Sequence, residues 1–91
     1  MKRQEVVRDL KAYIVREILE GDEAGLNEES PILEWGLLNS LEIIRLLRFI
    51  REQFGVQLEP KQVTPDTFKD IRSIADLIIL DASSRVRHGR G

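Results

Sequence analysis

The sequence predicts an all-α fold: a small bundle of three main helices plus one short helix, with a long loop between helices 1 and 2. Three observations predict it. Apolar residues recur at helical spacing in three segments of the chain. Residues that favour helix ends stand before or after these segments. Ninety-one residues, 42% of them hydrophobic, suit a single small domain with one core. There is no internal repeat.

The first helix is expected from about residue 3 to residue 20. Val7, Leu10, Ile14 and Ile18 recur there at helical spacing, with charged residues between them. Gly21 is a plausible stop, because glycine commonly follows the last helical residue.

A long loop is expected next, over "GDEAGLNEESPILEWG", residues 21–36. The stretch contains glycines and a proline and has no sustained periodicity. Long loops in compact domains tend to be functional or to pack through their own side chains. We expect five apolar residues to anchor this loop on the core: Leu26, Ile32, Leu33, Trp35 and Leu37.

The second helix is expected from residue 40 to residue 54. Asn39 is a good N-cap, and Glu42 follows three residues later, which resembles a capping box with Asn in place of Ser or Thr. Gly55 supplies the C-terminal stop. One face of this helix is apolar, and comprises Ile43, Leu46, Leu47, Ile50 and Phe54. The opposite face comprises Leu41, Arg45, Arg48 and Glu52, while Ile44 and Phe49 lie on the borders.

The C-terminal part predicts a short helix and a last main helix. Thr64 and Pro65 form a helix start, so one or two helical turns are expected within residues 64–70. Asp70 can cap a helix whose buried face is Ile71, Ile74, Ala75 and Ile78. We expect the domain to cover residues 1–82 and residues 83–91 to form a disordered basic tail, because "SSRVRHGRG" has no apolar period.

Composition excludes several classes of function. The chain has no cysteine, so disulfides and thiolate metal sites are ruled out. Residues 1–40 carry five basic and nine acidic side chains, and the net charge of the chain is −2. A nucleic-acid-binding protein would instead be expected to carry clustered basic residues. No apolar run approaches the roughly 18–20 residues that span a membrane. The first residues lack the apolar core of a signal peptide, so a cytoplasmic protein is expected.

The sequence gives little support to an enzyme. Its only histidine, His88, lies in the expected tail, where a Ser–His pair or a histidine metal site would have no scaffold. The acidic residues of the long loop lack the alternating ligand spacing of a calcium loop and are better explained as a solvated face; they are Asp22, Glu23, Glu28 and Glu29. No glycine-rich phosphate loop is present. Trp35 could contact a ligand, although a lone tryptophan among apolar residues usually packs in the core.

Ser40 lies at a position that favours covalent modification of its hydroxyl. A serine at a helix start is common, because its hydroxyl competes for backbone hydrogen bonds. Here Asn39 already occupies the cap position, which places Ser40 in the first turn with its hydroxyl free. A phosphate ester on that hydroxyl would lie at the positive end of the helix dipole, close to unpaired N–H groups. The position therefore suits an anionic attachment.

The stretch "GLLNSLEIIRLLRFIREQFGVQLEP" is similar to the region around the prosthetic-group serine of acyl and peptidyl carrier proteins. That region typically contains a glycine, Asp-Ser-Leu, an apolar helix and a Phe-Gly-Val/Ile-like close. The resemblance extends to the leading helix, the long loop and "TPDTFKDIRSIADLI", and covers about residues 3–80. It implies a four-helix bundle of carrier-protein type, with no catalytic residues of its own.

The resemblance implies that Ser40 accepts a phosphopantetheine arm from coenzyme A through a phosphodiester. Its thiol would carry acyl or aminoacyl groups as thioesters, which accounts for a carrier without cysteine. The implied partners are a phosphopantetheinyl transferase, an acyl- or aminoacyl-loading enzyme, and downstream synthase or transferase enzymes. Neither nucleic acid nor a membrane is implied, and a monomer is expected.

Two departures from the family pattern refine these expectations. The residue before the serine is usually Asp and here is Asn39, which caps a helix equally well but lacks a charge that the transferase could use. Fatty-acid carriers usually present an acidic second helix, whereas Arg45, Arg48 and Arg51 make this one slightly basic. We therefore expect a discrete carrier for polyketide, peptide-like or unusual lipid synthesis.

The surface expected to meet partner enzymes comprises Leu41, Ile44, Arg45 and Arg48, beside the arm. Two alternatives stay open. The cargo could be aminoacyl or peptidyl rather than acyl. The chain could also be an interaction module that keeps the carrier fold without the arm, a reading that Asn39 alone supports.

Overall fold

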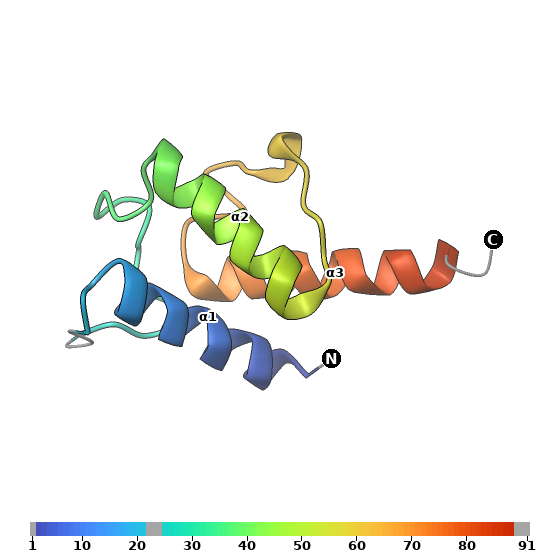
Figure 1. Ribbon diagram of the computed structural model, residues 1–91, viewed down its shortest axis with the longest axis horizontal. Coiled ribbons are helices and arrows are strands. Elements are labelled where there is room, and N and C mark those ends of the chain that lie inside the picture. The colour runs from blue at the N-terminus through green and yellow to red at the C-terminus, as the bar shows by residue number, and fades with distance from the viewer. Residues whose placement is uncertain (1, 22–24, 89–91) are drawn as a thin grey trace.

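The computed structural model describes residues 2–21 and 25–88, and for residues 84–88 it describes the backbone alone. The elements follow in the order α1 (Arg3–Glu17), α2 (Ser40–Phe54), the short 3-10 helix η1 (Pro60–Gln62) and α3 (Ile71–His88) (Figure 1). The described residues contain no strand. The predicted all-α class, with three main helices, one short helix and a long first loop, is confirmed.

The core lies between the three long helices. Helices α1 and α3 pack against each other, and α2 runs antiparallel alongside α1 (Figure 1). Each helix contributes aliphatic residues at helical spacing, and the loops add Leu26, Ile32 and Phe68. The fully buried larger side chains are Val6, Leu10, Ile14, Ile32, Leu46, Ile50, Val56, Phe68, Ile71, Ile74 and Ile78. This interior is almost entirely aliphatic, in keeping with an aromatic content of only 5%.

Aromatic contacts fix α2 against α1. The rings of Tyr13 and Phe49 stack with their centroids 4.4 Å apart, and Phe54 meets Phe49 edge-on at 6.0 Å. Such pairs contribute about 0.5–1.5 kcal/mol beyond the area they bury. Further along the two helices, the side-chain amide of Gln53 donates to a carboxylate oxygen of Asp9 at 3.2 Å. The two helices are therefore held together at several points along their length.

Helix α1 ends at Glu17, three residues before the predicted end. The N–H groups of Ile18 and Leu19 both donate to the carbonyl of Ile14, at 2.9 and 3.0 Å. The N–H of Gly21 then reaches back to the Val15 carbonyl at 2.7 Å, with a positive φ of 92°. These bonds satisfy the carbonyls of Ile14 and Val15, and glycine adopts the required φ without a steric penalty. Gly21 therefore ends the turn after the helix, as the sequence predicts for a stop residue.

The long loop is anchored on the core by four of the five residues expected to do so. Leu26 and Ile32 are buried, and Leu33 and Leu37 are half-buried against the core. Trp35 was expected to be the fifth anchor, and that prediction is wrong, because 53% of its surface is exposed. Trp35 lies in a turn in which its N–H donates to the Pro31 carbonyl at 2.9 Å.

The short helix does not form where the sequence predicted it. The 3-10 helix is Pro60–Gln62, which precedes the stretch predicted to be helical, while residues 65–67 form a turn. Thr64 does begin this turn, since its carbonyl accepts from the N–H groups of Thr67 and Phe68 at 3.1 and 3.0 Å. The turn does not continue because Phe68 is fully buried and Asp70 then starts the next helix. Core packing and a strong cap thus override the local preference of "TPDTF".

Helix α3 begins as predicted and ends later than expected. The side chain of Asp70 accepts from the N–H of Ser73 at 2.8 Å, and Ile71, Ile74, Ala75 and Ile78 are fully buried. The helix continues to His88, where we expected irregular chain from residue 83 (Figure 1). The reason is local, since residues 71–88 contain neither glycine nor proline and Gly89 is the first stop. Residues 89–91 of the expected tail lie outside the described residues.

Candidate functional site

The site is the N-terminal end of α2, at the periphery of the molecule where the long loop enters the helix (Figure 1). Asn39 has an extended backbone (φ −80°, ψ 179°), and its Oδ1 accepts from the Glu42 N–H at 2.9 Å. Its carbonyl accepts the first bond of the helix, from the Ile43 N–H at 2.9 Å. This is the N-cap geometry that the sequence predicts, so Ser40 is the first helical residue.

The hydroxyl of Ser40 is available for chemistry. The residue is exposed, and among the described residues its Oγ makes no hydrogen bond. The Asn39 side chain takes up the Glu42 N–H, and the other N–H groups at the start of the first turn, which have no partner within the helix, face the same end. An anionic group on this oxygen would be stabilised by those N–H groups and by the helix dipole. The site therefore fits a phosphate ester.

The other described serines differ from Ser40 in burial or in position. Ser30 is buried, and its Oγ donates to the Gly25 carbonyl at 3.2 Å and accepts from the Asn27 N–H at 2.8 Å. Ser73 is half-buried in the first turn of α3, behind its cap. Ser83 is exposed but lies far inside α3, away from a helix start. The side chain of Ser84 is outside the described residues.

The capping box is only half formed. In a full box the Glu42 side chain would bond back to the Asn39 N–H. Instead its Oε2 lies 3.7 Å from Nη1 of Arg45, and its buried Oε1 has no hydrogen-bond partner. The expectation of a box is therefore corrected to a single Asn39 cap.

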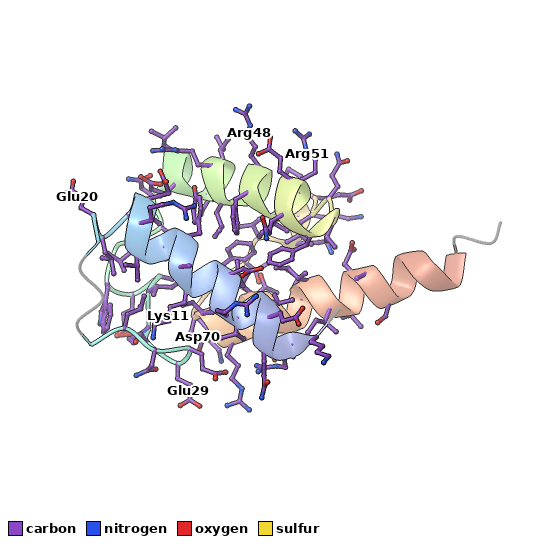
Figure 2. The ribbon with its side chains drawn as sticks, turned by 60° about the horizontal axis from the view of Figure 1, so that its bottom comes forward. Lys11, Glu20, Glu29, Arg48, Arg51 and Asp70 are labelled. Atoms are coloured by element: carbon purple, nitrogen blue, oxygen red, sulfur yellow. The ribbon has the colours of Figure 1, made fainter. Side chains whose placement is uncertain are left out.

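The three arginines of α2 are in different environments. Arg45 lies 3.7 Å from both Glu17 and Glu42, and so links α2 to the end of α1. Arg48 pairs with Glu52 one turn away at 3.3 Å, and both side chains are largely exposed. Arg51 has no ion pair among the described residues. Figure 2 shows Arg48 and Arg51 projecting from α2 away from the bundle.

Two apolar side chains beside Ser40 are exposed to solvent. Leu41 is 61% exposed and Ile44 is 64% exposed. The sequence left Ile44 on the border between core and surface, and the structure places it on the surface. Arg45 and Arg48 are also exposed, so all four residues expected to meet partner enzymes are accessible. That they bind a partner stays a prediction.

The structure adds little to the other candidate sites. Asp22 and Glu23 lie outside the described residues, while Glu28 and Glu29 pair with Arg3 and Arg72 at 3.4 and 3.0 Å. No cluster of His, Cys, Asp or Glu among the described residues could hold a metal ion. In the same part of the chain no helix is long and apolar enough to cross a membrane.

The family model for the phosphopantetheine attachment site matches residues 8–78, which include the whole of α2. This match covers most of the chain. The chain belongs to the phosphopantetheine-binding carrier family. Members of the family carry phosphopantetheine covalently, and the lone hydroxyl at the start of α2 fits that group. The resemblance to acyl and peptidyl carrier proteins is confirmed at this level.

Two known proteins are similar to this chain. It is 26% identical over 66 residues to "Probable acyl carrier protein PigG" of Serratia sp. (strain ATCC 39006), covering 72% of this chain and 76% of that protein. It also resembles a chain in a solved structure titled "Crystal structure of FAD-dependent dehydrogenase", with 33% identity and a TM-score of 0.72. That match covers 76% of this chain and 97% of the other, so the matched chain is shorter than this one.

Proposed function

We propose that this protein is a discrete acyl carrier whose phosphopantetheine arm is attached at Ser40. The observation that carries the proposal is the free, exposed hydroxyl of Ser40 at the first residue of α2, directly after the Asn39 cap. A nucleophilic oxygen in that position can attack the pyrophosphate of coenzyme A, form the phosphodiester and release 3′,5′-adenosine bisphosphate. The hydroxyl proton leaves with a base of the transferase.

The protein's own contribution is to hold the arm and present it. The arm supplies a thiol, which the 91-residue chain itself lacks because it has no cysteine. Ser40 fixes one end of the arm on a rigid helix, and the partly unpaired N–H groups of that helix face the phosphate. Partner enzymes then react with a thioester that is always attached to the protein at the same residue.

The proposed partners are the transferase, an acyl- or aminoacyl-loading enzyme and the downstream synthase or transferase enzymes. Exposed apolar groups in the midst of polar surface are typical of interaction sites, so Leu41 and Ile44 support a contact surface around the arm. Arg45 and Arg48 would add charge complementarity, which acts mainly on association rate and partner choice. A basic α2 favours partners with acidic surfaces.

The cargo is proposed to be an acyl group of a specialised polyketide, peptide-like or unusual lipid pathway, with an aminoacyl group as the alternative. The solved relative is part of a structure titled for an FAD-dependent dehydrogenase, which makes such an enzyme a candidate partner. It would remove a proton and a hydride from adjacent carbons of the thioester-bound group and reduce FAD to FADH₂. With the dehydrogenase of that structure as the probe, the loaded protein would lose the mass of two hydrogens.

Intact-mass measurement tests the proposal. The full chain is incubated with coenzyme A and a broad-specificity phosphopantetheinyl transferase. The wild type should gain one phosphopantetheinyl group, while Ser40→Ala should gain none and keep a helical circular dichroism spectrum. No gain in the wild type would instead favour the unmodified interaction module. A gain that persists in Ser40→Ala would place the attachment elsewhere.

A further inference from the structure

The outer side of α3 carries leucines that the bundle does not cover. Leu80 is 68% exposed, and Leu77, one turn earlier, is only half-buried. Both leucines border a hollow of about 290 Å³, whose whole lining is Asp66, Thr67, Ser73, Asp76, Leu77 and Leu80. The lining comes from α3 and from the turn before it, and includes no residue of α2. This surface is therefore separate from the one around Ser40.

The exposed leucines belong to a stripe with the spacing of a helix–helix seam. Five residues follow one another at alternating intervals of four and three residues, namely Ser73, Leu77, Leu80, Ser84 and Arg87. The backbone of α3 places them along one side of the helix, opposite the side that holds Ala75 and Ile78 in the core. Two helices that pack along their length meet through such a repeat.

The second half of α3 extends past the other helices (Figure 1). Residues 82–88, "ASSRVRH", include two serines, a valine and a histidine, which have modest helix propensity. A short helical segment without a packing partner is only marginally stable in water. A second helix lying along the stripe would therefore stabilise the end of α3 as well as cover the leucines.

The two ends of the stripe carry opposite charge. Residues 82–91 contain three arginines and no acidic residue, so they carry +3. Because the whole chain carries −2, residues 1–81 carry −5. At the start of the stripe, Asp66 has no ion pair among the described residues, and the Asp76 side chain stays 60% exposed beside Arg3. The start of one α3 is thus electrostatically complementary to the end of another.

We propose that a second copy of this protein covers the stripe, with the two α3 helices antiparallel and related by a two-fold axis. Antiparallel packing brings opposite charges together, whereas parallel packing would bring like charges together. In a two-fold interface each contact occurs twice. With the axis between Leu77 and Leu80, Leu77 of each copy meets Leu80 of the other. Arg87 then lies opposite the start of the other α3, next to the turn that contains Asp66.

This dimer would leave the proposed attachment site free. The start of α2 and the free end of α3 lie at opposite ends of the molecule (Figure 1). The inference goes beyond the proposed function and departs from the monomer that the family resemblance implied. One helix face from each copy is a small interface, below the ~1,200 Å² of standard interfaces, so we expect a weak dimer. Its population should rise with protein concentration.

Sedimentation equilibrium of the full, unmodified chain, from micromolar to millimolar concentration, tests the association. The average mass of the wild type should rise from 10.5 kDa toward twice that value. Leu80→Asp should weaken the association at least tenfold, because it places a carboxylate in the apolar centre. Leu41→Asp is the matched control on α2, where Leu41 is 61% exposed, and should associate like the wild type. Circular dichroism verifies that each variant is folded.

Charge exchange tests the complementarity of the two ends. Arg87→Glu and Asp66→Arg should each weaken the association several-fold, and the two changes combined in one chain should restore it. Restoration by the double change isolates the contact between these two positions from their separate effects. Added salt should weaken the wild-type dimer, since exposed charges are screened. Equal association by the wild type and all three variants would contradict the charge complementarity on which the antiparallel arrangement rests.

Disulfide formation tests the orientation, because the chain has no cysteine of its own. The proposed register places Ser73 of one copy opposite Ser84 of the other. A mixture of the variants Ser73→Cys and Ser84→Cys should therefore form the mixed disulfide faster than either variant forms a disulfide with itself. Faster self-pairing of both variants would show a parallel arrangement and overturn the proposed one.

The outcomes are independent of the attachment at Ser40, since the protein tested carries no arm. A wild type that stays at 10.5 kDa up to millimolar concentration would overturn the proposal and leave the stripe to a partner enzyme. A dimer that persists in Leu80→Asp but is lost in Leu41→Asp would also overturn it, because association would then occur through α2.

Discussion

The Oδ1 of Asn39 accepts a hydrogen bond from the backbone N–H of Glu42 at 2.9 Å, across the residue that we propose for modification. Asn39, the residue before Ser40, is therefore the residue that caps the helix. The hydroxyl of Ser40 is thereby spared from capping, and the first turn of α2 is held in helical form around it. Asn39 thus stabilises the start of the helix, while the neighbouring Ser40 keeps its hydroxyl free to react.

Asn39 should be replaceable by Asp at little cost in stability. The two residues cap helices equally well, so Asn39→Asp should change the free energy of unfolding by only a few tenths of a kcal/mol, and Asn39→Ala should lower it by about 1 kcal/mol. Urea denaturation measures both. We also expect Asn39→Asp to raise the rate of arm transfer, because Asp restores the charge usual at this position. An unchanged or lower rate would mean that the natural transferase is adapted to Asn.

Reversing the charge of Arg45 and of Arg48 should have different consequences. Arg45→Glu would put a third carboxylate beside Glu17 and Glu42, and should destabilise the contact between α1 and α2 by about 1 kcal/mol. Arg48→Glu removes only an exposed pair with Glu52, so the fold should be unaffected.

The Arg48→Glu variant also tests the choice of partner. Arg48→Glu should slow loading by the cognate loading enzyme, most strongly at low ionic strength, where charges are least screened. Loading rate as a function of salt concentration measures this. Coinciding curves for wild type and Arg48→Glu would show that Arg48 only solubilises the surface and that Leu41 and Ile44 determine binding.

Tyr13 should make the protein less stable at alkaline pH. Burial against α2 raises the pKa of its phenol above the ordinary value of 10.0. Since the folded state favours the neutral phenol, this contribution is fully present below the unfolded-state pKa and is lost as the pH rises through the folded-state pKa. Tyr13→Phe should show a smaller loss of stability between neutral and strongly alkaline pH. Parallel pH profiles for the two proteins would contradict this role.

Removing residues 83–91 should leave the melting temperature nearly unchanged. Among the α3 residues whose side chains the structure describes, the last buried one is Ile78, and Ser83 is exposed. We therefore expect the last turns to contribute little to the core. A truncated protein that melts several degrees lower would show that the end of α3 packs on the bundle or binds a second region.

Much of the fold can be predicted from local sequence signals. The helix ends that differ from the prediction are those where such signals are weak or were not used. Helix α2 begins and ends at the predicted residues because Asn39 and Gly55 fix both ends, Gly55 with a left-handed φ of 70°. The end of α1 lacks a comparable cap and was placed three residues late. The end of α3 was predicted too early, because the prediction relied on apolar periodicity and not on helix propensity.

The candidate site also has features that local sequence predicts and features that it does not. Ser40 could be found from the sequence because its position depends on the neighbouring cap and on a local motif. The exposure of Trp35 could not, because a lone aromatic residue carries no periodicity and its burial is decided by how the loop turns at residues 31–36.

The most direct measurement of the central claim is the location of the arm by tandem mass spectrometry. After transfer from coenzyme A, the tryptic peptide of residues 17–45 contains two serines, Ser30 and Ser40. Ser30 is buried and hydrogen-bonded through its hydroxyl, so it serves as an internal control. We expect fragment ions that place the phosphopantetheinyl mass on Ser40 alone. The same mass on Ser30, or on any peptide outside residues 17–45, would contradict it.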